Sequence, residues 1–338
     1  MRPKGKNPVK RQTQMLVGTA LAGSLLLTGC TQSQQQPSPS PSSSAAEETR
    51  KLTQIGVGVL PIVDVAPLYL GMKEGIFEKH GLKLVPETAQ GGSVIVPAVT
   101  SGQMQIGFSN VTSLAIARDK GLAIKIIAPA SGSTGVDGND YTAVMAKKDS
   151  GIQGAKGLEG KKVAVNTVRN ILDSTVSAAM RKQGADPKKV KFVELPFPDM
   201  PAQLAAGTVD AIVVSEPFVT VAKDEGNVNV LSNYALATDD LTVATYFTTE
   251  EYMAKEPETV QAFRDAVREA QEFATNNPDK VRQVLTEYTK MTKDVADRVV
   301  LSKYPSVVNA DAVAEVAKMA ETDGLIKDAK KVSDLVAQ

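Results

Sequence analysis

The sequence has one cysteine, one histidine and no tryptophan among its 338 residues. One cysteine excludes an internal disulfide framework, and together with one histidine it excludes the usual structural zinc sites and a histidine-rich catalytic metal centre. The 38 basic and 38 acidic side chains balance, so the chain lacks the basic excess that is typical of nucleic-acid-binding proteins. We therefore expect no metal, no organic cofactor and no nucleic-acid partner.

What the sequence does contain is the composition of an ordinary folded protein. Hydrophobic residues make up 42% and charged residues 22% of the chain. These fractions exclude a collagen-like or wholly disordered chain, and the length predicts two domains at roughly 100 to 200 residues each.

The first thirty residues have the pattern of an export signal. Five basic residues without an acidic partner occur in the first eleven positions, and an apolar run of about 13 residues follows from Met15 to Leu27. A helix of that length reaches only about 20 Å, short of the ~30 Å hydrocarbon core of a membrane. We therefore predict a signal peptide over 1–29 rather than a permanent membrane span.

The sequence Leu27-Thr28-Gly29-Cys30 follows directly and resembles the bacterial lipobox. The resemblance implies cleavage before Cys30 and attachment of lipid, such as palmitate, to its thiol. The alternative is an idle or buried cysteine, but its position, the upstream charges and the apolar run all favour lipidation. We therefore expect a protein that is anchored to the cell membrane on its extracytoplasmic face.

Residues 30–50 are rich in Gln, Ser, Pro and Ala and show no apolar periodicity. Such a segment buries too little apolar surface to offset its conformational entropy, and alternating Pro and Ser favour an extended chain. We interpret it as a disordered tether that follows the lipidated cysteine.

From Leu52 onward, short β-branched runs alternate with helical patterns. The expected strands are 53–59, 82–86, 104–108 and 123–129, and the expected helices between them are 65–79, 93–101 and 111–120. This alternation predicts βαβ crossovers and a parallel sheet.

A second unit of the same kind begins after Asp140. Its expected strands are 141–147, 162–165, 190–195 and 211–214, and its expected helices are 171–183 and 202–207. An extended segment over 241–248 and a helical tail from Glu250 complete the chain. Lobe 1 is therefore expected over 51–140 plus 245–338 and lobe 2 over 141–244, with two hinge crossings and a ligand cleft at the carboxyl ends of the strands.

Five segments in this order resemble the substrate-binding proteins of ABC importers for nitrate, taurine, aliphatic sulfonates and thiamine pyrimidine precursors. The segments are APLYLGMKEGIFEKHGLKLV (66–85), Gly91-Gly92-Ser93, SGQMQIGFSN (101–110), LEGKKVAVNT (158–167) and GTVDAIVVSEPF (207–218). The resemblance implies an α/β, two-lobed periplasmic-binding-protein fold of type II. It also implies a monomer that captures a small anionic or zwitterionic solute and delivers it to a membrane permease and its ATPase.

Polar residues in these segments fall where a strand ends and a helix begins. At such points free backbone N–H groups and side-chain donors favour an anion, although Ser, Thr and Asn there also cap their own helices. The family places its pocket at these loops, which favours ligand contact for the set. The expected donors are Gly92, Ser93, Ser109, Asn110, Asn166 and Thr167, with Thr245 as a weaker candidate.

Charged residues beside these loops leave the kind of ligand open. Asp64, Asp140 and Glu216 are candidates to receive an amine, and Glu216 is equally placed to cap the helix that follows Pro217. Arg169 is a candidate for a sulfonate or carboxylate, although a solvated position is favoured. His80 is expected at the surface.

Three other functions are compatible with this fold. One is the binding of a thiamine pyrimidine precursor, another is an enzyme of the pyrimidine-synthase or menaquinone-pathway type, and the third is an adhesin or sensor subunit. The enzyme is disfavoured because pyrimidine synthases use a cysteine cluster and a pocket histidine, whereas this chain has only Cys30 and His80.

Overall fold

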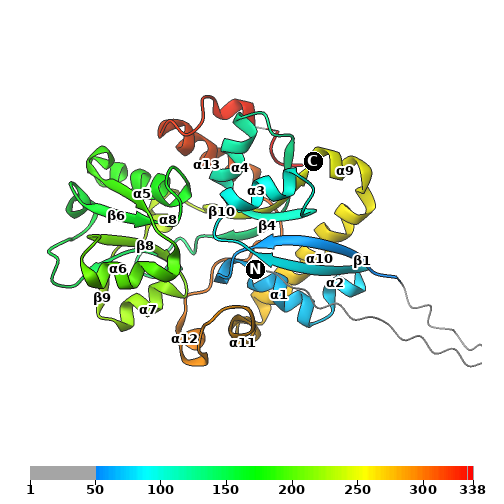
Figure 1. Cartoon of the computed structure of the whole chain (residues 1–338), viewed down its shortest axis with the longest axis horizontal. Helices are drawn as coiled ribbons and strands as arrows, with labels where there is room; N and C mark the ends of the chain where they lie inside the picture. The colour runs from blue at the N-terminus through cyan, green and yellow to red at the C-terminus, as the bar shows by residue number, and fades with distance from the viewer. Residues whose placement is uncertain (1–50, 333, 338) are drawn as a thin grey trace, which may run out of the picture. The chain divides into compact units, whose positions relative to one another are not determined.

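The protein was analysed as a computed structural model, which describes residues 51–332 and 334–337. These residues form two five-stranded sheets, each flanked by helices (Figure 1). We call the first sheet with its helices lobe 1 and the second sheet with its helices lobe 2. The fold is therefore the expected α/β architecture of two lobes.

The sheet of lobe 1 has the strand order β2-β1-β3-β10-β4. Its strands are β1 (Thr53–Val59), β2 (Leu82–Thr88), β3 (Ile106–Asn110), β4 (Ile124–Gly132) and β10 (Thr242–Thr249). Strand β1 pairs in parallel with β2 and β3, whereas β10 runs antiparallel to β3 and β4. Strands β3, β4 and β10 are almost wholly buried because helices cover the sheet.

The sheet of lobe 2 has the order β7-β6-β8-β5-β9. Its strands are β5 (Thr142–Lys147), β6 (Lys162–Val165), β7 (Lys191–Glu194), β8 (Ala211–Ser215) and β9 (Asn227–Leu231). Strand β6 is parallel to β7 and β8, and β5 is antiparallel to β8 and β9.

The expectation of a wholly parallel sheet is therefore wrong for both lobes. Strands β5 and β10 each begin directly after the chain has crossed from the other lobe. They consequently enter their sheets in the direction opposite to strands that are linked by helical crossovers within one lobe. Both sheets are mixed.

The helices of lobe 1 that precede the first crossing lie between its strands. They are η1 (Val63–Val65), α1 (Ala66–Lys73), α2 (Ile76–Lys79), α3 (Gly92–Thr100) and α4 (Val111–Asp119). A single helix was expected over 65–79, but Gly75 adopts a φ of 72° and separates α1 from α2. Such a left-handed conformation ends an α-helix, and glycine adopts it without steric cost.

Lobe 2 contains more short helices than the sequence pattern predicts. They are η2 (Ala155–Leu158), α5 (Ile171–Lys182), η3 (Pro187–Lys189), η4 (Phe197–Asp199), α6 (Met200–Ala206), α7 (Phe218–Asp224) and α8 (Asn233–Ala237). Helices α7 and α8 and strand β9 were not predicted. Each has only five to seven residues, which is too short for a clear periodicity.

The C-terminal part is helical, as expected. Its helices are α9 (Glu250–Lys255), α10 (Pro257–Asn276), α11 (Pro278–Tyr288), α12 (Lys293–Arg298), α13 (Ala310–Thr322) and η5 (Ala329–Val332). Helix α11 begins with a proline at its first position, and Thr292 caps α12 by accepting a hydrogen bond from Val295 N at 3.3 Å. Helix α10 packs on α1, and α13 lies against α4 of lobe 1 and α5 of lobe 2 (Figure 1).

The chain passes between the sheets over 133–141 and 232–241. On this basis we propose the lobe boundaries 51–140 plus 245–338 and 141–244; β10 begins at Thr242, slightly before the proposed return. The predicted signal peptide, the predicted lipidation site at Cys30 and the predicted tether fall outside the described residues. No helix in the described part of the chain has the length and apolar character that a membrane span requires.

Candidate functional site

A small cavity lies between the two lobes, at the carboxyl ends of four strands. Its volume is about 40 Å³. The lobe 1 residues that line it are Leu60, Ile62, Asp64, Gly92, Phe108, Asn110, Val243 and Ala244, and the lobe 2 residues are Asn166, Ile171, Leu172, Phe197, Ser215 and Tyr234. Because β1, β3, β6 and β8 all end here, the cavity occupies the position where open α/β sheets bind ligands.

Asn110 and Asn166 approach the cavity from opposite lobes. Asn110 is the N-cap of α4, and its Oδ1 accepts a hydrogen bond from Ser113 N at 2.8 Å. Asn166 directly follows β6 and does not cap α5, because Asn170 does so by accepting from Ile171 N at 2.8 Å. Among the described residues no hydrogen bond uses the amide of Asn166, so its donor and acceptor both remain for a ligand.

Gly92 begins α3 and is packed against Ser109 of β3. A Cβ atom at position 92 would lie 2.1 Å from Ser109 Oγ, which excludes any other residue without movement. The glycine is thus required by this close approach and not by an unusual backbone turn, since Gly91 is extended and φ at Gly92 is not positive. The first N–H groups of α3 have no partner within the helix and are placed at the cavity wall.

Asp64 is the only carboxyl group among the described residues that line the cavity. Its side chain is 3% exposed, and its Oδ1 accepts a hydrogen bond from Ser131 Oγ at 2.6 Å. Its Oδ2 has no partner among the described residues. Burial raises the pKa of Asp64 to about 6, although the hydroxyls of Ser131 and Tyr141 partly lower it.

Glu216, the other acidic candidate, is used within the protein. Its Oε2 accepts from Thr220 N at 2.9 Å, and its Oε1 accepts from Thr220 Oγ1 at 2.9 Å and from Val300 N at 3.2 Å. Burial raises its pKa, and these hydrogen bonds oppose the rise. It does not line the cavity, so its carboxylate holds the start of α7 and the segment after α12.

Ser109, Thr167 and Thr245 are not among the residues that line the cavity. Ser109 is buried and its Oγ donates to Asn110 O at 3.3 Å, while Thr245 is buried in β10 and its hydroxyl has no partner among the described residues. Thr167 is half-buried beside Asn166, and Ser93 is the second residue of α3. Ser109 therefore shapes the cavity indirectly, because its side chain packs against Gly92.

Three residues at or beside the cavity were not predicted from the sequence. Asn170 caps α5 in a capping box with Asp173, and an Asn followed three residues later by an acid is the pattern that could have revealed it. Ser215, whose buried Oγ has no partner among the described residues, and Tyr234 line the cavity. Ser215 precedes Glu216 at the end of a strand, whereas nothing in the local sequence of Tyr234 indicates its position.

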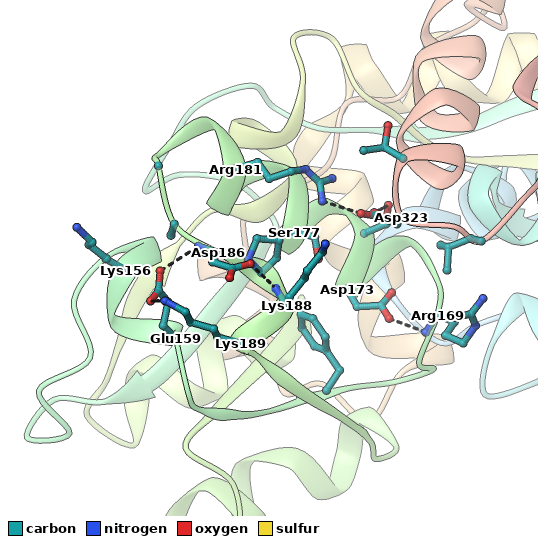
Figure 2. A pocket seen from close by; sticks show the side chains of 17 residues that line it. Lys156, Glu159, Arg169, Asp173, Ser177, Arg181, Asp186, Lys188, Lys189 and Asp323 are labelled. Atoms are coloured by element: carbon teal, nitrogen blue, oxygen red, sulfur yellow. Dashed lines mark hydrogen bonds and ion pairs between the residues drawn. The ribbon is translucent and has the colours of Figure 1, made fainter.

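A larger groove of about 910 Å³ lies between α5 and η3 of lobe 2 and the end of α13 (Figure 2). Its charged side chains pair with one another: Arg181 Nη1 lies 2.7 Å from Asp323 Oδ1, and Lys189 Nζ lies 2.7 Å from Glu159 Oε2. Arg169 belongs to this groove, where it is exposed and donates to Gly324 O at 3.1 Å. We favour the interlobe cavity as the site because its polar groups are buried and incompletely paired.

No group of three or more potential metal ligands occurs among the residues that the structure describes. His80 lies after α2, as expected, and its Nε2 is 2.9 Å from Glu269 Oε2. Only 24% of its side chain is exposed, so it is half-buried and less exposed than predicted.

Comparison with known proteins identifies the family of this chain. The family model described as "NMT1/THI5 like" matches residues 62–281. This match covers every strand except β1 and more than half of the chain. The chain belongs to the NMT1/THI5-like family.

Similar proteins of this family are binding proteins. The chain is 29% identical over 188 residues to the taurine-binding periplasmic protein of Escherichia coli, a match that covers 56% of each chain. The ligand-binding component of an ABC-type import system from Staphylococcus aureus superposes with a TM-score of 0.73 at 17% identity, covering 84% of this chain and 96% of that one. The alkanesulfonate-binding protein of Xanthomonas axonopodis pv. citri, bound to MOPS, gives a TM-score of 0.71 at 15% identity and covers 84% and 98%. The structural likenesses establish the periplasmic-binding-protein fold for this NMT1/THI5-like chain.

Proposed function

We propose that the chain is the extracytoplasmic solute-binding lipoprotein of an ABC importer and that it captures a small anionic or zwitterionic solute of the sulfonate, taurine or nitrate class. The observation that carries this proposal is the interlobe cavity, in which Asn110 and Asn166 approach from opposite lobes. A ligand that contacts both lobes stabilises their closed arrangement, whereas a ligand that contacts one lobe does not. The taurine-binding relative supports the solute class.

The proposed contacts are drawn from the residues named from the sequence. Gly92, Ser93, Asn110 and Thr245 would contact the solute from lobe 1, and Asn166 and Thr167 would contact it from lobe 2. Of these, Gly92, Asn110 and Asn166 line the cavity together with Asp64. We give Ser109 and Glu216 supporting roles, because the first fixes the position of Gly92 and the carboxylate of the second is occupied.

A thermal-shift screen tests the proposal directly. The full chain is mixed with sulfonates, taurine, nitrate, carboxylates and a thiamine pyrimidine precursor. A ligand at about 100 times its dissociation constant adds about 2.7 kcal/mol to the free energy of unfolding. Failure of every class to shift the unfolding temperature would overturn the proposed function, and a shift by the pyrimidine alone would favour that alternative.

Two substitutions locate the site. Asn166→Ala should weaken binding of the solute found in the screen by about 1 to 3 kcal/mol, because it leaves a buried ligand group unpaired, and Ser93→Ala should act in the same direction. Asn276→Ala is the matched control, since Asn276 is exposed at the end of α10 and donates to Glu272 O at 2.9 Å. Unchanged affinity in both test variants would place the pocket elsewhere.

The anchor and the partners need separate measurements. Mass spectrometry of the mature N-terminus should find a lipid-modified Cys30 as the first residue, and an unmodified thiol or cleavage elsewhere would remove the anchor.

Co-purification with a permease and its ATPase would support transport over sensing. Incubation with each bound solute should give no turnover, because we propose a binding protein and not an enzyme.

A further inference from the structure

The interlobe cavity contains a buried carboxylate that the protein itself satisfies only in part. Asp64 is 3% exposed, Ser131 donates to its Oδ1 at 2.6 Å, and its Oδ2 has no partner among the described residues. Buried polar atoms are hydrogen-bonded in the great majority of cases, and an exception requires an explanation. Because Asp64 lines a ligand cavity, the direct explanation is that a donor on the ligand satisfies its Oδ2.

The described lining of the cavity around Asp64 provides no positive charge. No Lys, Arg or His is among the described residues that line the cavity, and much of the wall is apolar, as at Phe108, Ile171 and Leu172. In such surroundings an unpaired carboxylate is costly, and an ion pair is stronger than it is in water.

The titratable groups that face Asp64 are Asp140 and five tyrosines. Asp140 is itself engaged by Ser133 Oγ, by Thr134 N at 3.1 Å and by Tyr141 N at 2.9 Å. The tyrosines all have pKa values that burial raises, so they stay neutral; they are Tyr141, Tyr234, Tyr246, Tyr288 and Tyr304. A solute therefore meets negative charge in this cavity and no compensating cation.

The other polar groups of the cavity suit the opposite end of a solute. The amide of Asn166 and the first N–H groups of α3 at Gly92 can donate to an oxygen acceptor. A helix N-terminus in particular favours a negative group. The cavity thus offers a carboxylate for one end of a solute and neutral donors for the other end.

We propose that Asp64 is the specificity-determining residue of this cavity and that its Oδ2 accepts a hydrogen bond from the protonated amine of a small zwitterionic solute. This inference rests on the proposed function and narrows it. A solute that carries only negative charge, such as nitrate or an alkanesulfonate, gains nothing from Asp64 and is repelled by it. An aminosulfonate or an amino acid with a separated amine and acid carries a complementary group for each end.

Matched solute pairs test this inference in the full chain, purified in detergent, by isothermal titration calorimetry. Taurine is compared with ethanesulfonate and β-alanine with propionate, since each pair differs in the amine, and nitrate is measured alone. We expect at least one amine-bearing member to bind about 30-fold or more tightly than its partner, because a buried charged hydrogen bond is lost with the amine.

Asp64→Asn separates charge from shape in the same assay. The variant keeps an oxygen for Ser131 Oγ but loses the negative charge, so the affinity for the amine-bearing solute should fall about 30-fold or more. Asp149→Asn, in an exposed turn between β5 and η2, is the matched control and should leave the affinity unchanged. Equal loss in both variants, or no loss in Asp64→Asn, overturns the assignment.

The pH dependence gives a readout that a merely structural role of Asp64 would not produce. Ionised Asp64 binds the amine, so the affinity should rise as the pH increases through about 6 and then level off. A protonated Asp64 that donates to an anion would give the opposite trend. The slope should disappear in Asp64→Asn.

The outcomes separate the two proposals. If ethanesulfonate, propionate or nitrate binds as well as the amines, or if the pyrimidine binds and the amines do not, the inference about Asp64 fails while solute binding stands. If no member of the panel and no pyrimidine binds, the proposed function and the inference both fail.

Discussion

Asn170 of lobe 2 donates a hydrogen bond from its Nδ2 to Ser113 Oγ of lobe 1 at 2.9 Å. Asn170 is 5% and Ser113 is 7% exposed, so this contact between the lobes is shielded from water. Asn170 also caps α5, and the backbone N–H of Ser113 is bound by Asn110 at the cavity. The contact therefore connects the first turns of the two helices that flank the candidate site.

Ser113→Ala should lower the free energy of unfolding by about 1 to 2 kcal/mol, because it leaves the buried amide of Asn170 without this partner. Urea unfolding of the full chain measures the change. Ser101→Ala, in an exposed position after α3, should have little effect. An unchanged midpoint in Ser113→Ala would show that the contact between the lobes contributes nothing.

Gly92→Ala should destabilise the protein by about 1 to 3 kcal/mol and weaken solute binding, since the added Cβ would lie 2.1 Å from Ser109 Oγ. Thermal unfolding and calorimetry measure the two effects. Adding Ser109→Ala should recover part of the stability, because the nearest side-chain atom of residue 109 would then be Cβ at 3.0 Å. If the double variant is no better than Gly92→Ala, steric contact with Ser109 is not the cause.

Asp64→Asn should stabilise the protein without solute at neutral pH. The native pKa of Asp64 is about 6 and lies above its ordinary value of 3.8, so between these values the native state binds more protons than the unfolded state. The free energy of unfolding of the wild type therefore falls as the pH rises through this window and stays lower above it. The variant avoids this loss, which is about 1 to 3 kcal/mol.

Urea unfolding at about pH 4 and about pH 7 measures this difference. The variant and the wild type should be similar at the lower pH and differ at the higher one. Burial also raises the pKa of Asp173 to about 6, which adds the same trend to both proteins and cancels in the comparison. A variant that is less stable than the wild type at neutral pH would mean that the carboxylate of Asp64 has a structural role.

Glu216→Ala should destabilise the protein, whereas Asp64→Asn should stabilise it, although both carboxyl groups are buried. It removes the acceptor for Thr220 N, Thr220 Oγ1 and Val300 N, so the free energy of unfolding should fall by about 2 to 3 kcal/mol. Solute affinity in the folded variant should remain unchanged. Glu225→Ala, at the exposed end of the same helix α7, is the control, and a selective loss of affinity in Glu216→Ala would restore Glu216 as a ligand contact.

The sequence predicts most strands and the longer helices because their apolar runs and caps are local. The antiparallel direction of β5 and β10 is not local, since it depends on the route of the chain between the lobes. Likewise, α7 and α8 are stabilised by packing on lobe 2 and carry too few residues for a visible period.

In the candidate site too, local features could be predicted from the sequence and long-range contacts could not. Gly92, Asn110 and Asn166 could be placed near the cleft because each stands at a junction of strand and helix. Asp64 and Glu216 could not be told apart, because their difference lies in distant partners. Glu216 is satisfied by Val300, whereas only one oxygen of Asp64 is satisfied, by Ser131.

The most direct test of solute capture between the lobes is a crystal structure of the full chain with the tightest-binding solute of the panel. The account predicts electron density for the solute between Asp64 Oδ2 of lobe 1 and the amide of Asn166 of lobe 2. A solute bound in the larger groove beside Arg181 and Lys189, or one that touches a single lobe, would contradict it.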